Sequence, residues 1–216
     1  MKLEKLKQDG TFQNCAVVIL AAGQSKRLGH PKQLVVYKGK TLLNRAIETV
    51  EGVRVMPELS NINYQLSTIV VVLGAHFDEI KESISNKRIP VLKNENFEEG
   101  IASSIRCGLK EIIEKSPNVE SVIFLVCDQP FVHSELLLNL ISKHKKSGKP
   151  LVASQYENIL GTPALFHKSY FSELAQLKGD AGAGKLIKQN LSEVAIVQFS
   201  NGVIDIDSSD DLKFLL

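Results

Sequence analysis

The sequence predicts an α/β protein with a mainly parallel sheet and helices on both faces, and two observations support this class. Apolar runs without alternation, typical of strands buried on both faces, occur at residues 16–20 (AVVIL), 68–73 (TIVVVL), 122–126 (VIFLV) and 194–197 (VAIV). Segments with helical spacing lie between them, at residues 42–50, 77–84, 103–113, 134–144 and 181–189. When strands and helices alternate in this way, functional residues lie in loops at the carboxyl ends of the strands.

The remaining segments favour one domain. Residues 1–14 are polar and lysine-rich, and we interpret them as an N-terminal extension without an assigned function. Residues 52–66 contain Pro57 and several asparagines, which predicts a long surface loop. A turn is expected at residues 148–150 (GKP), after which strand character resumes. Because that strand continues the same sheet, we expect a single domain over residues 15–216.

Composition excludes some classes of function. The chain has 216 residues, of which 44% are hydrophobic and 23% charged, as in ordinary globular proteins. Its formal net charge is only +2, and no run of five or six like charges occurs. This balance argues against nucleic acid or an anionic membrane as a partner, so that any anion must bind locally.

The cysteines and the amino terminus bear on the compartment. Cys15, Cys107 and Cys127 lie far apart and form no CxxC pair, so we expect buried, reduced thiols. The first residues, MKLEKLKQDG, lack an apolar signal core, and no run of about 18 apolar residues occurs. We therefore expect a cytoplasmic protein that does not span a membrane.

The segment after the first expected strand, residues 20–32 (LAAGQSKRLGHPK), predicts an anion-binding loop. Small side chains allow backbone N–H groups to approach phosphate oxygens. Arg27 and Lys32 would add charge. The spacing matches neither GxxxxGK[ST] nor GxGxxG, and a turn with solvated lysines is the alternative. The expected phosphate contacts are Leu20, Ala21, Ala22, Gly23, Arg27 and Lys32.

This segment resembles the signature LAAGxSxRMGxxK of the MobA-like nucleotidyltransferases, with Leu28 where Met is common. Within that superfamily the chain is most similar to the molybdenum cofactor cytidylyltransferase branch, because the loop opens with AAG and not AGG. The resemblance extends to later motifs over most of the chain. It implies a Rossmann-like fold of the nucleotide-diphospho-sugar transferase type.

One carboxylate is expected at the end of a buried strand. In VIFLVCDQP, Asp128 follows the apolar run directly, and Mg²⁺ prefers such hard oxygen ligands. It also resembles the metal-binding Asp of the family's CDxP motif, with Gln129 where Met is frequent. The alternative is that Asp128 caps the helix beginning near Ser134, or a turn at Pro130.

A second carboxylate comes from residues 205–212 (DIDSSDDL), which resemble the family's DIDTPEDL ending. By that match Asp207 is the second expected metal ligand, and Asp205 is the reserve because alternation places both on one side of an extended segment. Asp210 and Asp211 are expected to stabilise the first turn of a terminal helix. Acidic residues before a helix are common, so a purely structural role for the segment stays open.

Two segments resemble parts of the family's nucleotide site. Gly74, in LGAH, resembles a position where the base passes close to the backbone. Residues 94–106 (NENFEEGIASSIR) are similar to the branch's NPxxxxGMxSSLR. This similarity implies that Gly100 and Ser103 contact the base or ribose, whereas Ser104 is as well explained as a helix cap.

Residues 161–166 (GTPALF) and 179–183 (GDAGA) resemble the branch's GxPxLF and GDxGA motifs, which belong to the acceptor side. The implied acceptor-binding residues are Thr162, Pro163, Gly179, Asp180 and Gly182. Asp180 could instead cap the helix that follows. The five histidines lie without metal-ligand spacing, and none is a candidate base.

The resemblance implies transfer of CMP from CTP to a molybdopterin-type acceptor, with Mg²⁺ as cofactor and a molybdoenzyme as possible recipient. Arg27, Lys32 and Asp128 are the expected catalytic residues. In-line attack by an acceptor phosphate would expel pyrophosphate, with catalysis from orientation and charge neutralisation. Three alternatives stay open: another phosphorylated acceptor such as a sugar phosphate, a non-catalytic carrier of the dinucleotide, and a reductase, which the missing GxGxxG disfavours.

Overall fold

The computed structural model describes residues 13–56 and 58–216. Most of the predicted N-terminal extension, residues 1–12, lies outside the described residues. The last two residues of that range, Gln13 and Asn14, are the first residues of strand β1. Within the described part of the chain, no helix has both the length and the apolarity needed to cross a membrane.

Seven strands form the main sheet, in the order β5-β4-β1-β6-β8-β7-β9. Strand β8 runs antiparallel to both of its neighbours, and the other pairs are parallel, so the mainly parallel sheet is confirmed. The strands are β1 Gln13–Ala21, β4 Tyr64–Leu73, β5 Val91–Lys93, β6 Val119–Val126, β7 Leu151–Tyr156, β8 Ile159–His167 and β9 Val194–Gln198. A separate hairpin pairs β2 Val36–Tyr37 with β3 Lys40–Thr41.

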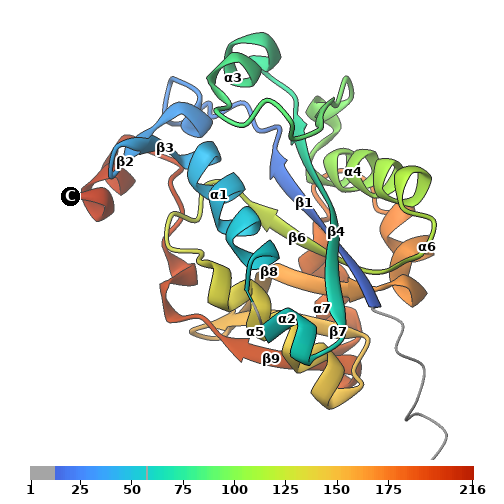
Figure 1. Cartoon of the computed structure of the whole chain (residues 1–216). Helices are drawn as coiled ribbons and strands as arrows, with labels where there is room; N and C mark the ends of the chain where they lie inside the picture. The colour runs from blue at the N-terminus through green and yellow to red at the C-terminus, as the bar shows by residue number, and fades with distance from the viewer. Residues whose placement is uncertain (1–12, 57) are drawn as a thin grey trace, which may run out of the picture.

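Helices cover both faces of this sheet (Figure 1). The α-helices are α1 Leu42–Arg54, α2 Glu58–Asn61, α3 Phe77–Ser83, α4 Ile101–Lys115, α5 Ser134–Ser147, α6 Phe171–Ala175 and α7 Ala183–Gln189. Short 3-10 helices are η1 Lys32–Leu34, η2 Phe97–Glu99, η3 Lys168–Tyr170, η4 Leu191–Glu193, η5 Ser200–Val203 and η6 Ser209–Leu215.

The residues of β1 pack against helices on both faces of the sheet. Val17 and Ile19 pack with α1, α3 and α5 on one face, whereas Ala16 and Val18 pack with α4, α6 and α7 on the other. A strand that is buried on both faces needs apolar residues at every position, which is why AVVIL shows no alternation. Strand β1 lies between β4 on one side and β6 on the other, so the strand order reverses beside β1. In open α/β sheets, ligands bind outside the carboxyl ends of the strands at such a point.

Three predicted element boundaries were wrong. The loop expected over residues 52–66 contains the end of α1, the short helix α2 and the start of β4. Helix α4 begins at Ile101, two residues before the predicted start, because Gly100 with φ of 113° ends the preceding turn. Helix α7 begins at Ala183 and not at residue 181. The turn at Gly148 is confirmed: it has φ of 66° and its N–H donates to the carbonyl of His144.

Candidate functional site

A cavity of about 270 Å³ opens at the carboxyl edge of the sheet, where β1 and β6 end. Its lining comes from the end of β1, the loop of residues 22–31 that follows it (the β1 loop), η1, η2, the start of α4, the end of β6 with the two residues after it, and the loop of residues 179–182 (the 179–182 loop). The lining residues are Leu20, Ala21, Ala22, Gly23, Lys32, Gln33, Phe97, Gly100, Ile101, Ser104, Val126, Cys127, Asp128 and Asp180. The topology thus brings together segments that are far apart in the sequence.

The backbone at the start of the β1 loop is held from its inner side by Gln33. This side chain is fully buried, and its Nε2 donates to the carbonyl of Ala21 at 2.7 Å and to that of Gly23 at 3.1 Å. The N–H groups of Gly23 and Gln24 donate to no atom within the described ranges. The carbonyls are therefore occupied, whereas these two donors remain for an anion.

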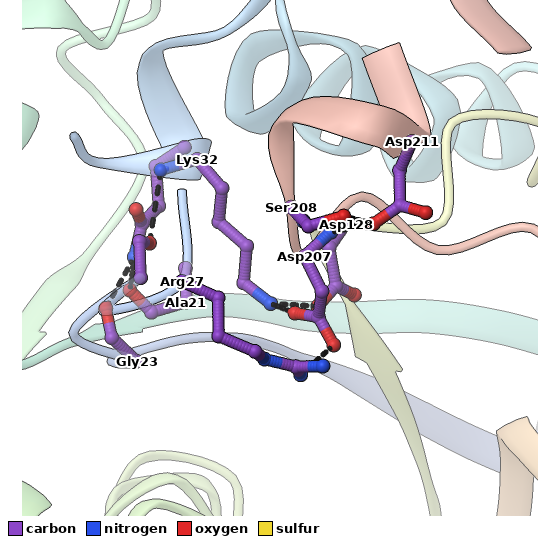
Figure 2. A network of polar contacts seen from close by, with 10 residues as sticks. Ala21, Gly23, Arg27, Lys32, Asp128, Asp207, Ser208 and Asp211 are labelled. Atoms are coloured by element: carbon purple, nitrogen blue, oxygen red, sulfur yellow. Dashed lines mark hydrogen bonds and ion pairs between the residues drawn. The ribbon is translucent and has the colours of Figure 1, made fainter. Parts of the chain in front are cut away.

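A network of charged side chains includes two residues of the cavity lining, Lys32 and Asp128 (Figure 2). Lys32 Nζ contacts Asp128 Oδ2 and lies 2.5 Å from Asp207 Oδ1, and Arg27 Nη2 lies 2.5 Å from Asp207 Oδ2. The side chains of Lys32 and Asp128 are each only 14% exposed, whereas that of Arg27 is 73% exposed. The network joins the β1 loop, the end of β6 and the C-terminal segment.

The C-terminal segment reaches this network because it is anchored on both sides of Asp207. The N–H of Ile206 donates to the carbonyl of Asp128 at 3.0 Å, and the Ile206 side chain is fully buried. After Asp207, the Asp211 carboxylate accepts from the N–H groups of Asp207 and Ser208 and from the Ser208 hydroxyl, which starts η6. The predicted role of Asp211 at the first turn of a terminal helix is confirmed.

The ion pairs also set the charge states in this network. Burial alone would raise the pKa of Asp207, but Lys32 and Arg27 hold that pKa below its ordinary value. Burial would lower the pKa of Lys32, yet Asp128 and Asp207 hold it above its ordinary value. At neutral pH Asp207 is therefore a carboxylate and Lys32 an ammonium.

The carboxylates have the chemistry that a divalent metal requires. Asp128 Oδ1 is buried and has no hydrogen-bond partner in the described part of the chain, which is costly for a charged oxygen. The other oxygen of Asp128, Oδ2, and Oδ1 of Asp207 both contact the ammonium of Lys32, so the two carboxylates lie close together. Mg²⁺ commonly binds through one or two carboxylates plus water and phosphate oxygens, so Asp128 and Asp207 fit such an ion. The described residues contain no group of three or more His, Cys, Asp or Glu side chains that could hold a metal.

The capping alternative for Asp128 was wrong. The residue that caps α5 is His133, whose side chain accepts from the N–H of Leu136. The neighbouring Cys127 also lines the cavity, and burial, together with Asp128, raises the pKa of its thiol to about 12. That thiol is uncharged at neutral pH and is a poor nucleophile.

Two neighbouring serines, Ser103 and Ser104, lie differently with respect to the cavity. Ser103 lies outside the cavity lining, and its hydroxyl donates to the carbonyl of Gly100 at 2.8 Å and accepts from Asn94 at 2.8 Å. Ser104 lines the cavity and accepts from Asn94 at 3.0 Å. Neither caps α4, which begins after Gly100. A ligand in this cavity would therefore meet Ser104, and the expected contact of Ser103 stays a prediction.

Gly74 is needed for packing within the protein. A Cβ at this position would lie 2.5 Å from the Cβ of Phe97 and 2.7 Å from the carbonyl oxygen of Ala22. Phe97 thus packs against Gly74 and also lines the cavity, whereas Gly74 does not. The contact of Gly74 with a nucleotide base stays a prediction.

The 179–182 loop packs on the start of α4. The carbonyl of Gly179 accepts from the N–H of Ala102 at 3.1 Å, and a Cβ at Gly100 would collide with Asp180 and Gly179. Asp180 lines the same cavity as Asp128. It does not cap α7, because the N-cap is Gly182 without a side-chain bond, so the capping alternative was wrong. The segment expected on the acceptor side therefore borders the space assigned to the nucleotide.

The other expected acceptor residues lie outside the cavity. Strand β8 pairs Ala164 with Phe124 of β6 in antiparallel register, which brings Thr162 and Pro163 toward the end of β6. Pro163 is buried, and its carbonyl accepts from the Ser154 hydroxyl at 2.7 Å. The hydroxyl of Tyr156 lies against Gly161. Of the five expected acceptor residues only Asp180 lines the cavity, and Thr162, Pro163, Gly179 and Gly182 do not.

Sequence reasoning missed six residues that line the cavity: Gln33, Phe97, Ile101, Ser104, Val126 and Cys127. Gln33 directly follows an expected phosphate ligand, and a polar residue beside apolar ones at that point was a usable signal. Phe97 and Ile101 flank Gly100, but nothing in an apolar side chain distinguishes cavity lining from core. Their positions depend on the tertiary fold.

Comparison with known proteins places the chain among nucleotidyltransferases. A family model described as "MobA-like NTP transferase domain" matches residues 17–194. The "Bifunctional protein GlmU" of Bifidobacterium animalis subsp. lactis is 25% identical over 200 residues, which cover 90% of this chain and 39% of that protein. The chain thus spans less than half the length of that relative.

Two other relatives match over more of their length. A "Probable molybdenum cofactor guanylyltransferase" of Bacillus cytotoxicus is 24% identical over 172 residues, which cover 77% of this chain and 75% of that protein. The "Nicotine blue oxidoreductase" of Paenarthrobacter nicotinovorans is 24% identical over 211 residues, which cover 92% and 95%.

Among solved structures, Rv0371c from Mycobacterium tuberculosis H37Rv has a TM-score of 0.79 and 27% identity, covering 95% of this chain and 98% of that chain. Another structure of Rv0371c, described as a complex with manganese, has a TM-score of 0.73 and 22% identity, covering 95% and 99%. These structures have the same mainly parallel sheet fold.

Proposed function

The chain belongs to the MobA-like NTP transferase domain family, and on that premise we propose that it transfers CMP from CTP to a molybdopterin-type acceptor with release of pyrophosphate. Its catalytic residues are Arg27, Lys32 and Asp128, and Asp128 and Asp207 hold a divalent metal, Mg²⁺. The reaction takes place in the cytoplasm, and a molybdoenzyme receives the product.

One observation carries this proposal. A single cavity brings together the backbone at the end of β1, the Lys32 ammonium and the Asp128 carboxylate. Transfer of a nucleotidyl group needs hydrogen-bond donors for a polyphosphate, and carboxylates for a metal. The two sets must be close enough to act on the same phosphate group. Binding of a finished dinucleotide alone would not require Lys32 and Asp128 in the cavity lining, so this arrangement favours an enzyme over a carrier.

The residues would act by orienting and neutralising two anions. The N–H groups of Gly23 and Gln24 and the Lys32 ammonium bind the triphosphate, and the exposed Arg27 binds the leaving pyrophosphate. An ionised phosphate oxygen of the acceptor then attacks the α-phosphorus in line, and the bond to the pyrophosphate oxygen breaks. No general base is needed for this attack. When bound, Mg²⁺ supplies charge neutralisation at the phosphate oxygens.

The choice of CTP rests on the β1 loop and not on the shape of the cavity. The AAG opening of the loop resembles the cytidylyl branch, whereas a relative that is 24% identical to the chain is described as a probable guanylyltransferase. The manganese complex of Rv0371c supports a divalent metal in this fold. The identity of the base therefore has to be measured.

The test is incubation with molybdenum cofactor and Mg²⁺ plus CTP, GTP, ATP or UTP in separate reactions, followed by mass detection of the product. We expect a dinucleotide with CTP and pyrophosphate release that requires nucleotide and acceptor together. If a dinucleotide forms with GTP and not with CTP, GTP is the nucleotide substrate. Pyrophosphate release with a sugar phosphate, and none with molybdenum cofactor, would contradict the proposed molybdopterin-type acceptor.

A reductase is a second candidate because the match to nicotine blue oxidoreductase covers 92% of the chain. The β1 loop lacks the GxGxxG of dinucleotide-binding loops, and the two cations that pair with the carboxylates, Arg27 and Lys32, suit a triphosphate better. The absorbance of NADH or NADPH at 340 nm distinguishes the two. Oxidation of either cofactor by the protein with nicotine blue, without pyrophosphate release in the assay above, would favour the reductase.

A further inference from the structure

Lys32 lies between the two proposed metal ligands, Asp128 and Asp207, and contacts both of them. Three of the four carboxylate oxygens of Asp128 and Asp207 contact a cation, two through Lys32 and one through Arg27. Only Asp128 Oδ1 has no such partner in the described part of the chain. Two carboxylates are thus balanced by one ammonium and one guanidinium.

A divalent cation would find this site unfavourable as it stands. The four charged groups sum to zero, and the ammonium of Lys32 lies where an ion bridging Asp128 and Asp207 would be repelled. Because Lys32 and Asp128 are largely buried, solvent screens that repulsion only weakly. A metal could bind both carboxylates only if Lys32 leaves them.

The cavity offers Lys32 another set of partners. Its side chain lines the same space as Gly23, and its own N–H is held by the Ser25 hydroxyl at 3.0 Å, so the backbone of Lys32 stays beside the β1 loop. Phosphate oxygens bound at this loop would lie within reach of a flexible four-carbon side chain. They carry the charge that would compensate Lys32 for the loss of the carboxylates.

We propose that Lys32 is an exchangeable counter-ion, which pairs with Asp128 and Asp207 in the nucleotide-free protein and moves to the nucleotide's phosphates on binding. This movement frees the carboxylates for the metal. The inference rests on the metal assignment in the proposed function. It makes metal affinity depend on the nucleotide, and by linkage the nucleotide's affinity depends equally on the metal.

The test measures Mn²⁺ binding without nucleotide, from the electron paramagnetic resonance signal of free Mn²⁺. Lys32→Met removes the counter-ion, and we expect it to bind Mn²⁺ about tenfold more tightly than the wild type. Lys26→Met is the matched control, because Lys26 is an exposed residue of the adjacent β1 loop and forms no ion pair within the described ranges. Its affinity for Mn²⁺ should equal that of the wild type.

Unchanged or weaker Mn²⁺ binding by Lys32→Met would overturn the inference, and so would an equal gain in Lys26→Met, since that result would show a general effect of charge. If circular dichroism shows that Lys32→Met does not fold, Lys32→Gln replaces it, because its amide can donate to both carboxylates without a charge. The same gain is expected for that variant.

These outcomes separate the inference from the proposed function. If Lys32→Met binds Mn²⁺ more tightly but the wild type makes no dinucleotide, the result would support the counter-ion and contradict the proposed reaction. Dinucleotide formation by the wild type, with no gain in Mn²⁺ affinity in Lys32→Met, would support the reaction and overturn the counter-ion.

Discussion

At the scale of single residues, the carboxamide of Gln33 holds the backbone where β1 passes into its loop. Its two donated hydrogen bonds, to the carbonyls of Ala21 and Gly23, join a fully buried side chain to the segment that we assign to the triphosphate. An amide nitrogen suits this position because it offers two donors and no charge, whereas a carboxylate would repel both carbonyls.

Gln33→Met keeps the length of the side chain and removes both donors. We expect a loss of about 2 kcal/mol in the free energy of unfolding, and a lower affinity for CTP because the loop amides are no longer held in place. Thermal unfolding and calorimetric titration with CTP measure the two effects. Gln189→Met, at an exposed position in α7, should change neither. Unchanged CTP affinity in Gln33→Met would contradict the positioning role.

The buried His144 and the partly exposed His167 beside it predict how stability depends on pH. The rings of His144 and His167 lie 5.7 Å apart, and His144 also packs edge-on against Tyr64. Burial lowers the pKa of His144 below its ordinary value of 6.5. Burial and His144 also lower the pKa of His167, against the opposing effect of Glu120. The folded protein therefore disfavours protonation of both rings.

Because the unfolded chain binds protons that the folded chain does not, the free energy of unfolding should fall as the pH decreases through 6.5 and below. Thermal unfolding between pH 7.5 and 5 measures this slope. His144→Gln should reduce it, whereas His30→Gln, at an exposed position, should leave it as in the wild type. An identical slope in His144→Gln would contradict the assignment to this pair.

The sequence predicted some residues of the candidate site better than others. Lys32 and Asp128 were predicted because each follows a strand end within a recognisable motif, and the structure brings them into contact. That Ser104 and not Ser103 lines the cavity could not be predicted, because both fit the motif and only the direction of each side chain on α4 distinguishes them. Motifs identify a segment more reliably than they identify which side chain faces a ligand.

At the scale of secondary-structure elements, helix α4 approaches β1 closely at Gly108. A Cβ at this glycine would collide with a methyl group of Val18 and would lie 3.2 Å from one of Val72. The helix can pack this closely only where it lacks a side chain. Since α4 begins at the cavity, its distance from the sheet also determines where Gly100 and Ser104 lie.

Gly108→Ala should therefore lower the free energy of unfolding by about 1–3 kcal/mol, even though alanine favours helices over glycine. Gly184→Ala in α7 is the matched control, because no heavy atom lies within 4 Å of a Cβ there. That variant should be neutral, or more stable by about 0.4–1 kcal/mol. Chemical denaturation measures both variants. Equal stability of the two would contradict the close packing of α4.

Elements whose residues follow a regular pattern were predicted, and those with mixed signals were not. The unbroken apolar runs identified the cores of β1, β4, β6 and β9. Strand β8 was missed because Gly161 and Pro163 interrupt its pattern, and its antiparallel direction depends on pairing with residues far away in the sequence. The residues between α1 and β4 carry loop-like composition, yet they hold the short helix α2.

At the scale of the whole molecule, the fold assembles the candidate site from opposite ends of the chain. Asp207 reaches Lys32 because the C-terminal segment binds the end of β6 through Ile206. The sequence predicted the class of the sheet and the edge where functional residues gather, since both follow from the order of strands and helices. It could not predict that Lys32 would lie between two carboxylates, which depends on three-dimensional contacts alone.

The central claim, that this cavity is a site of nucleotidyl transfer, depends most directly on Asp128. The decisive measurement is the rate of pyrophosphate release with CTP, molybdenum cofactor and Mg²⁺ for the wild type, Asp128→Asn and the control Asp210→Asn, whose side chain is exposed in η6. We predict a loss of about a hundredfold or more in Asp128→Asn, with unchanged circular dichroism, and near-wild-type release in Asp210→Asn. Full activity in a folded Asp128→Asn protein would contradict the account.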